Sequence, residues 1–222
     1  TCSDRSSENF AVLKKTAVNS GKNFWMSEVD NGNLAGTNAK NMGAGLSLAV
    51  NILEDMNSMQ PSAWVMWDIL DKHKDAEFVA PNGTNSEANT SNAQHIGTWG
   101  VGMVNHDTKE IELTQKYYVY GQFTKYINPG DTIIASSPTT LAAYNKDTGA
   151  IKIVAVNTTG DTQNYRFDLS AFSQTGTSAK IIRTSGSFTD GEHWKDVGTA
   201  EVKDGKFRFD LPANSVTTFV ID

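Results

Sequence analysis

The chain has 222 residues, enough for one large domain or two small ones. Its 19 basic and 25 acidic side chains give a net charge of −6 without any basic run, which argues against a nucleic-acid partner. The single cysteine, Cys2, excludes an internal disulfide, the dispersed histidines predict no metal site, and no apolar run approaches the about 18 residues of a membrane span.

The first part of the chain, up to Pro129-Gly130, alternates helical patterns with short apolar runs. Helices are predicted at residues 8–20, 39–59 and 115–127. Apolar strands, which we expect to be buried, are predicted at 23–27 and 63–67, and the polar segment over 71–92 is predicted to be a loop. This order is typical of β/α units around a parallel sheet, in which the loops after the strands hold the functional residues.

The second part of the chain shows short alternating segments separated by turn residues, such as Asp147-Thr148-Gly149 and Asp204-Gly205. Eight strands are predicted, at 132–135, 141–144, 151–157, 163–168, 179–183, 200–202, 206–210 and 215–221. Many short strands with regular turns predict an antiparallel β-sandwich.

Three side chains stand where the predicted parallel strands end. Glu28 follows the strand in FWMSEVD, where a partly desolvated carboxylate can act as a nucleophile or an acid, although such a residue can also be a solvated rim side chain. Trp67 and Asp68 end the next strand, and Trp99 follows in GTWGVG. An exposed indole suits the apolar face of a sugar, but Trp67 could equally pack in the core.

Four segments of the chain, in this order, resemble the C-terminal half of glycoside hydrolase family 30, with most likeness to its endo-β-1,6-galactanase and β-1,6-glucanase-like members. They are SGKNFWMSEVD, PSAWVMWDIL, KYYVYGQFTKYINPGDTII and LPANSVTTFVID. The resemblance implies an α/β plus all-β fold, in which residues 1–131 form the C-terminal portion of a (β/α)8 barrel and residues 132–222 a side β-sandwich. It also implies that no cofactor is needed and that the protein is extracellular or secreted.

The resemblance also implies roles for individual residues. Glu28, in the segment Trp25-Met26-Ser27-Glu28, corresponds to the family's nucleophile, and Trp67 and Trp99 are expected to stack against the substrate. Asp68 and Asn31 are expected to recognise sugar hydroxyls. Retaining hydrolysis needs a second carboxyl about 5–5.5 Å from the nucleophile, and the family's acid/base glutamate has no counterpart in this sequence.

We therefore expect a retaining endo-glycoside hydrolase acting on a polysaccharide or oligosaccharide, a β-1,6-linked galactan or glucan, with this chain as its nucleophile half. The alternative is a non-catalytic fragment or carbohydrate-binding unit that lacks the acid/base glutamate. Because an open half-barrel leaves strand edges and apolar surface uncovered, we also expect self-association or pairing with a complementary N-terminal half-barrel chain.

Overall fold

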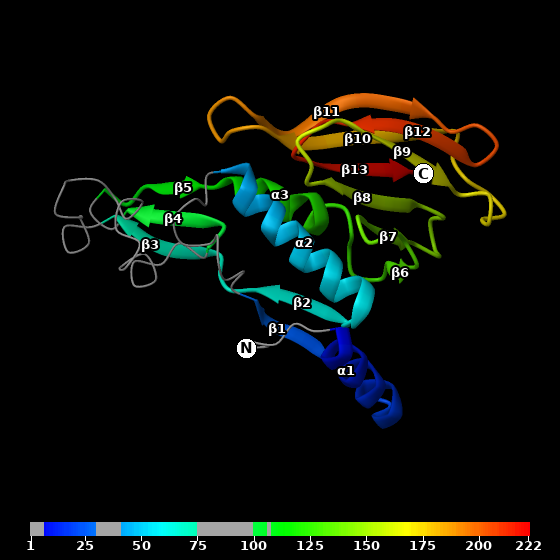
Figure 1. Cartoon of the computed structure of the whole chain (residues 1–222), viewed down its shortest axis with the longest axis horizontal. Coiled ribbons are helices and arrows are strands. Elements are labelled where there is room, and N and C mark those ends of the chain that lie inside the picture. The colour runs from blue at the N-terminus through cyan, green and yellow to red at the C-terminus, as the bar shows by residue number, and fades with distance from the viewer. Residues whose placement is uncertain (1–6, 30–40, 75–99, 106–107) are drawn as a thin grey trace. The chain divides into compact units, whose positions relative to one another are not determined.

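The computed structural model describes residues 7–29, 41–74, 100–105 and 108–222. The chain forms two compact units, residues 1–117 and 118–222 (Figure 1). The unit boundary therefore falls within a helix, α3 (Gln115–Thr124), whose later residues belong to the second unit. The domain limit after residue 131, which was expected from the resemblance, stays a prediction.

The first unit begins with the predicted alternation of helices and strands. Its first four elements are α1 (Ser7–Ser20), β1 (Trp25–Val29), α2 (Met42–Ser58) and β2 (Ala63–Met66). Helix α1 ends at Gly21, which has a φ of 61° and donates its N–H to Val18 O at 3.2 Å. The left-handed conformation at this position is the common end of a helix, and it favours glycine because glycine has no Cβ.

Strands β1 and β2 pair in parallel, with Trp25 opposite Ala63 and Val29 opposite Met66. The expectation that these strands are buried was wrong for most of their side chains, since Trp25 is 66% exposed and Val65 42% exposed. The physical reason is that each strand has only the other as a hydrogen-bonded neighbour within the described part of the chain. Only Val29 and Met66 are fully buried in the pair.

A second, three-stranded sheet follows in the first unit. It contains β3 (Leu70–Lys74), β4 (Gly102–Asn105) and β5 (Ile111–Leu113), with β3 and β4 parallel and β4 and β5 antiparallel. The prediction of a loop from residue 71 was therefore wrong for its first four residues, because backbone pairing with β4 holds this polar segment as a strand. Residues 75–99 lie outside the described ranges.

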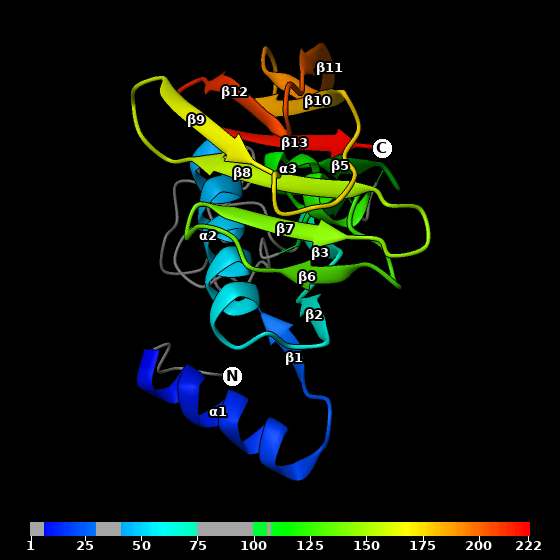
Figure 2. The same cartoon turned by 90° about the vertical axis from the view of Figure 1, so that its right-hand side faces the viewer.

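The second unit is an antiparallel β-sandwich, as predicted (Figure 2). One sheet has six strands in the order β11-β10-β13-β8-β7-β6, and the other has two, β12 and β9. The strands are β6 (Thr132–Ile134), β7 (Thr140–Tyr144), β8 (Ile151–Asn157), β9 (Gln163–Asp168), β10 (Ser178–Ser185), β11 (Glu192–Glu201), β12 (Lys206–Leu211) and β13 (Ser215–Ile221).

The two sheets of the sandwich meet in an aromatic core. Phe167 of β9 stacks on Phe207 of β12 with ring centroids 4.4 Å apart, and both contact Phe219 of β13 at 4.9 and 5.4 Å. These residues alternate with exposed polar ones along β9 and β12. Because successive side chains of a strand point to opposite faces, the alternation places one face in the core and the other in solvent.

Residues 118–124 of α3 pack on the six-stranded sheet through buried polar contacts. The Gln122 amide donates to Thr184 Oγ1 at 2.8 Å and accepts from Thr218 Oγ1 at 2.6 Å, and all three residues are inaccessible to solvent. The Trp194 indole N–H donates to the carbonyl of Tyr118 at 2.6 Å. Buried polar groups need such partners, so these bonds specify how the helix residues dock.

Candidate functional site

Glu28 lies in a β-bulge near the carboxyl end of β1. Met26 is opposite Trp64 and Val29 is opposite Met66, so β1 advances three residues while β2 advances two. The extra residue falls at Ser27 and Glu28, and both side chains are exposed. A bulge re-aims side chains and is over-represented beside active sites. The local backbone therefore presents the Glu28 carboxylate to solvent rather than to the core.

Trp67 and Asp68 follow the end of β2, at the same edge of the sheet as Glu28. The Trp67 N–H donates to the carbonyl of Val29 at 2.9 Å, which joins the carboxyl ends of the two strands. The Trp67 side chain is 52% exposed, Asp68 is partly buried, and the peptide bond between these two residues is cis. The structure thus brings Glu28, Trp67 and Asp68 to one end of a parallel strand pair, as the sequence predicted.

Two predicted site residues, Asn31 and Trp99, lie outside the described residues, as does the segment from 75 to 98. The expected roles of these residues in substrate binding therefore stay predictions.

A buried carboxylate that sequence reasoning missed supports the strand pair. Asp55 of α2 is fully buried, and its Oδ2 accepts from the Trp64 indole N–H at 2.7 Å. The Asp55 carbonyl also accepts from the N–H groups of Met59 and Gln60, which close the helix. The hydrogen bond between the Trp64 indole and the Asp55 carboxylate holds β2 against α2, and so it fixes the strand that Trp67 follows. The sequence signal that could have revealed this residue is the position of Asp55 among the apolar residues of the predicted helix.

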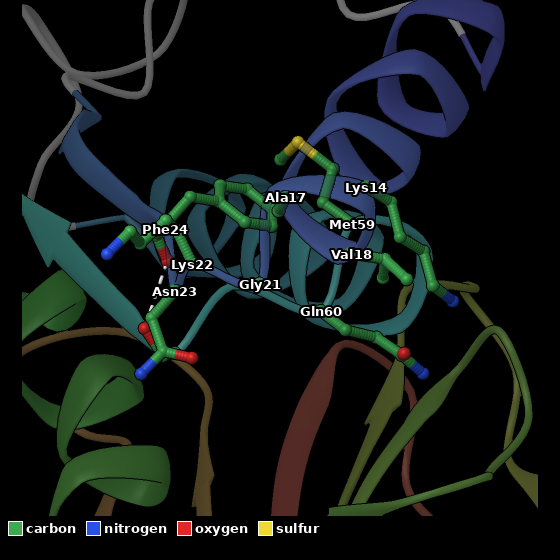
Figure 3. Close-up of a pocket in the computed structure, with 10 residues that line it drawn as sticks. Lys14, Ala17, Val18, Gly21, Lys22, Asn23, Phe24, Met59 and Gln60 are labelled. Carbon is green, nitrogen blue, oxygen red and sulfur yellow. Dashed lines mark hydrogen bonds between the residues drawn. The ribbon is translucent and has the colours of Figure 1, made fainter.

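A pocket of about 250 Å³ lies at the opposite end of the strand pair (Figure 3). Its lining is Lys14, Ala17, Val18, Gly21, Lys22, Asn23, Phe24, Met59, Gln60 and Ser62. These residues come from the end of α1 and from the segments that precede β1 and β2. The lining contains no carboxylate, so this pocket holds neither of the two carboxyl groups that retaining hydrolysis uses.

The described residues contain no group of three or more histidine, cysteine, aspartate or glutamate side chains that could hold a metal ion. None of the helices in the described ranges has the length and hydropathy of a transmembrane segment.

The chain is similar to known proteins in sequence and in fold. No family model matches the chain. Over 213 residues it is 24% identical to an endo-β-1,6-galactanase of Hypocrea rufa, and the match covers 95% of this chain but 37% of the galactanase. The chain thus spans little more than a third of that relative's length.

Solved structures show the same fold. A family 30 endoxylanase from Clostridium papyrosolvens C71 is similar with a TM-score of 0.65 and 21% identity, and the match covers 97% of this chain and 46% of that one. A family 30 subfamily 8 xylanase from Clostridium acetobutylicum has a TM-score of 0.65 and 25% identity, over 94% of this chain and 44% of that one.

These relatives are glycoside hydrolases by name, one a galactanase and two of them xylanases, and the chain is similar to them over nearly its whole length. The chain therefore has the fold of part of these enzymes, and it spans less than half the length of each.

Proposed function

We propose that this chain is the nucleophile-bearing half of a retaining endo-glycoside hydrolase, with Glu28 as the nucleophile. The observation that supports this role is the placement of the Glu28 carboxylate. It is exposed in a bulge at the carboxyl end of β1, at the edge where the half-exposed Trp67 follows the end of β2. The carboxyl edge of parallel strands is where barrel enzymes place their reacting groups.

In the proposed reaction, a Glu28 oxygen attacks the anomeric carbon as the glycosidic bond breaks. A second carboxyl group protonates the departing oxygen, and the same group then removes a proton from the water that releases the sugar from Glu28. This chain supplies the first carboxylate. The second belongs to the segment that the family places before this part, so we propose that turnover of a polysaccharide needs both segments.

Trp67 is proposed to hold the substrate. A half-exposed indole offers a large flat apolar face together with one N–H donor, which fits a pyranose ring and its hydroxyls. Asp68, at the next position, offers acceptor oxygens to hydroxyl groups. As the substrate we propose a β-1,6-linked galactan or glucan, following the galactanase to which the chain is similar.

Exposed apolar side chains on the first unit support a partner. Trp25, Ile69 and Leu70 are exposed, and β1 and β2 each pair on one edge only among the described strands. Unpaired strand edges and apolar surface promote association. We propose that a complementary half-barrel segment covers them, with self-association as the alternative, and that the protein is secreted.

The test of the nucleophile uses the protein in its complete form, assembled with the complementary segment. Glu28→Gln is expected to abolish hydrolysis of β-1,6-galactan while the melting temperature stays unchanged. The matched control is Glu8→Gln, which removes an exposed carboxylate from the start of α1 and should leave activity intact. Hydrolysis by the Glu28→Gln protein would show that Glu28 is not the nucleophile.

If the complete protein binds β-1,6-galactan without hydrolysing it, the alternative of a non-catalytic carbohydrate-binding unit is correct. Native mass spectrometry identifies the assembly. A stable monomer that resists dilution would contradict the proposed partner.

A further inference from the structure

The outer face of the two-stranded sheet in the second unit has an unusual charge arrangement. Strands β9 and β12 are antiparallel, and their exposed side chains form three cross-strand pairs. These pairs are Asp168 with Lys206, Arg166 with Arg208, and Asn164 with Asp210. All six side chains are exposed, because the intervening residues face the core.

The first and third pairs are complementary. Lys206 Nζ lies 3.0 Å from Asp168 Oδ2, and the Asn164 amide donates to Asp210 Oδ1 at 2.7 Å. Hydrogen bonds from the hydroxyl and N–H of Ser170 further engage Asp168 and, with Lys206, lower the pKa of its carboxyl well below its ordinary value. Both carboxylates on this face therefore already have hydrogen-bonding partners.

The middle pair is not complementary. Arg166 and Arg208 lie directly opposite one another, and neither guanidinium has a hydrogen bond or an ion pair in the described part of the molecule. Like charges directly opposite on a sheet are destabilising. Both side chains lie on the solvent face, so neither adds buried surface to the core.

From this geometry we infer that Arg166 and Arg208 form a binding site for a carboxylate on an acidic polysaccharide, separate from the hydrolytic site. Each guanidinium can donate two parallel hydrogen bonds to a carboxylate, and an anion between them would relieve their repulsion. The flanking Asp168, Asp210 and Asn164 offer acceptors and an amide to the hydroxyls of the same sugar chain. Together with the polysaccharide substrate of the proposed function, this carboxylate site fits a sugar chain that contains uronic acids.

The flanking groups argue against a nucleic acid. Single-stranded nucleic acids bind through aromatic side chains on which their bases stack, and none of the six exposed residues in the cross-strand pairs is aromatic. The choice of a polysaccharide over other carboxylates rests on the proposed function, whereas the carboxylate site itself rests on the arginine pair.

The test measures binding of oligogalacturonate by calorimetry, with the fully methyl-esterified oligomer as the uncharged comparison. The full chain is used with Glu28→Gln in all samples, so that binding is separated from hydrolysis. The variant is the double substitution Arg166→Gln and Arg208→Gln. Its control, Lys146→Gln with Lys180→Gln, removes the same charge from exposed positions outside β9 and β12 in the second unit.

We expect the arginine variant to weaken oligogalacturonate binding at least about tenfold, which corresponds to about 1.4 kcal/mol. The control should bind as the parent does, and the methyl ester should bind as weakly as the acid does to the arginine variant. The melting temperature of the arginine variant should equal or exceed that of the parent, since like-charge repulsion is removed. The double Arg→Lys variant, which keeps the charge without the planar fork, should bind with intermediate affinity.

Equal binding of the acid by the parent and the arginine variant would overturn the inference, as would equal binding of the acid and its methyl ester. Competition by single-stranded DNA at the same charge concentration would also overturn it, because it would show a general polyanion surface. The two claims can fail separately. Hydrolysis by Glu28→Gln would contradict the proposed nucleophile without affecting the carboxylate site, and unchanged oligogalacturonate binding by the arginine variant would contradict the site without affecting the nucleophile.

Discussion

Gly121 of α3 is the position at which a single methyl group should disturb the second unit most directly. A Cβ built at Gly121 would overlap Cζ2 of Trp194, and it would lie 2.5 Å from Cε2 and 2.7 Å from Nε1 of the same indole. The indole cannot easily move away. Its N–H donates to the Tyr118 carbonyl at 2.6 Å, and Lys125 Nζ lies 4.1 Å from the ring centroid.

The expected effect of Gly121→Ala combines one stabilising contribution and two destabilising ones. Alanine is favoured over glycine inside a helix by about 1 kcal/mol. Overpacking lowers the free energy of unfolding by about 1–3 kcal/mol. Losing the indole hydrogen bond lowers it by about a further 0.5–1.5 kcal/mol. The clash outweighs the helix preference, so the free energy of unfolding should fall by about 2 kcal/mol.

The measurement is urea unfolding followed by tryptophan fluorescence, together with a thermal melt. A loss of about 2 kcal/mol lowers the melting temperature of a unit of about 100 residues by roughly 8 °C. The control is Gly43→Ala in α2, where an added Cβ meets nothing within 4 Å, and this variant should be slightly stabilised. If Gly121→Ala is as stable as the parent, the described packing of α3 on Trp194 is incorrect.

Three further predictions follow from other contacts. Glu192 is hydrogen-bonded by Arg183, which lowers the pKa of its carboxyl from 4.5 to about 2. Because the pKa is lower in the folded state, the stabilisation is present above pH 4.5 and is lost as the pH falls toward 2. Glu192→Gln should therefore flatten the pH dependence of stability in acid unfolding titrations. Asp55→Ala should lower the free energy of unfolding by about 1–3 kcal/mol, since the partly buried Trp64 indole N–H loses its acceptor. A urea melt in which Asp55→Ala matches the parent would contradict this. Trp67→Ala should raise KM for the polysaccharide about tenfold with little change in kcat, as measured by reducing-sugar release, and an unchanged KM would show that Trp67 does not stack on the substrate.

The sandwich was the part of the fold that the sequence predicted best. Strands such as β8 and β13 combine apolar residues with clear turn signals, and their hydrogen-bonded partners lie within the same unit. Strand β11 was predicted only at its last residues. It is an edge strand with few buried side chains and with register shifts against β10, and Gly198 in it has a φ of 98°. An exposed, irregular edge leaves little hydrophobic periodicity to detect.

The first unit was harder to predict because local patterns do not report what lies beside a strand. The apolar runs of β1 and β2 predict burial, but within the described chain these strands have one neighbour each. Likewise, the contact of Asp55 with Trp64 depends on how separate elements pack. The same holds in the second unit for Gly121 and Trp194. The positions of Glu28 and Trp67 at strand ends could be predicted, since they follow directly from where the apolar runs stop.

The most direct test of the proposed nucleophile is covalent trapping. A 2,4-dinitrophenyl 2-deoxy-2-fluoro-β-galactoside or glucoside has a leaving group that needs no protonation, and its fluorine slows release of the sugar, so a glycosyl-enzyme accumulates without the second carboxyl. Intact-mass and peptide mass spectrometry of the protein should find one fluorinated glycosyl group per chain, attached to Glu28, and none on Glu28→Gln. Labelling at another residue, or equal labelling of the parent and Glu28→Gln, would contradict the assignment of Glu28 as the nucleophile.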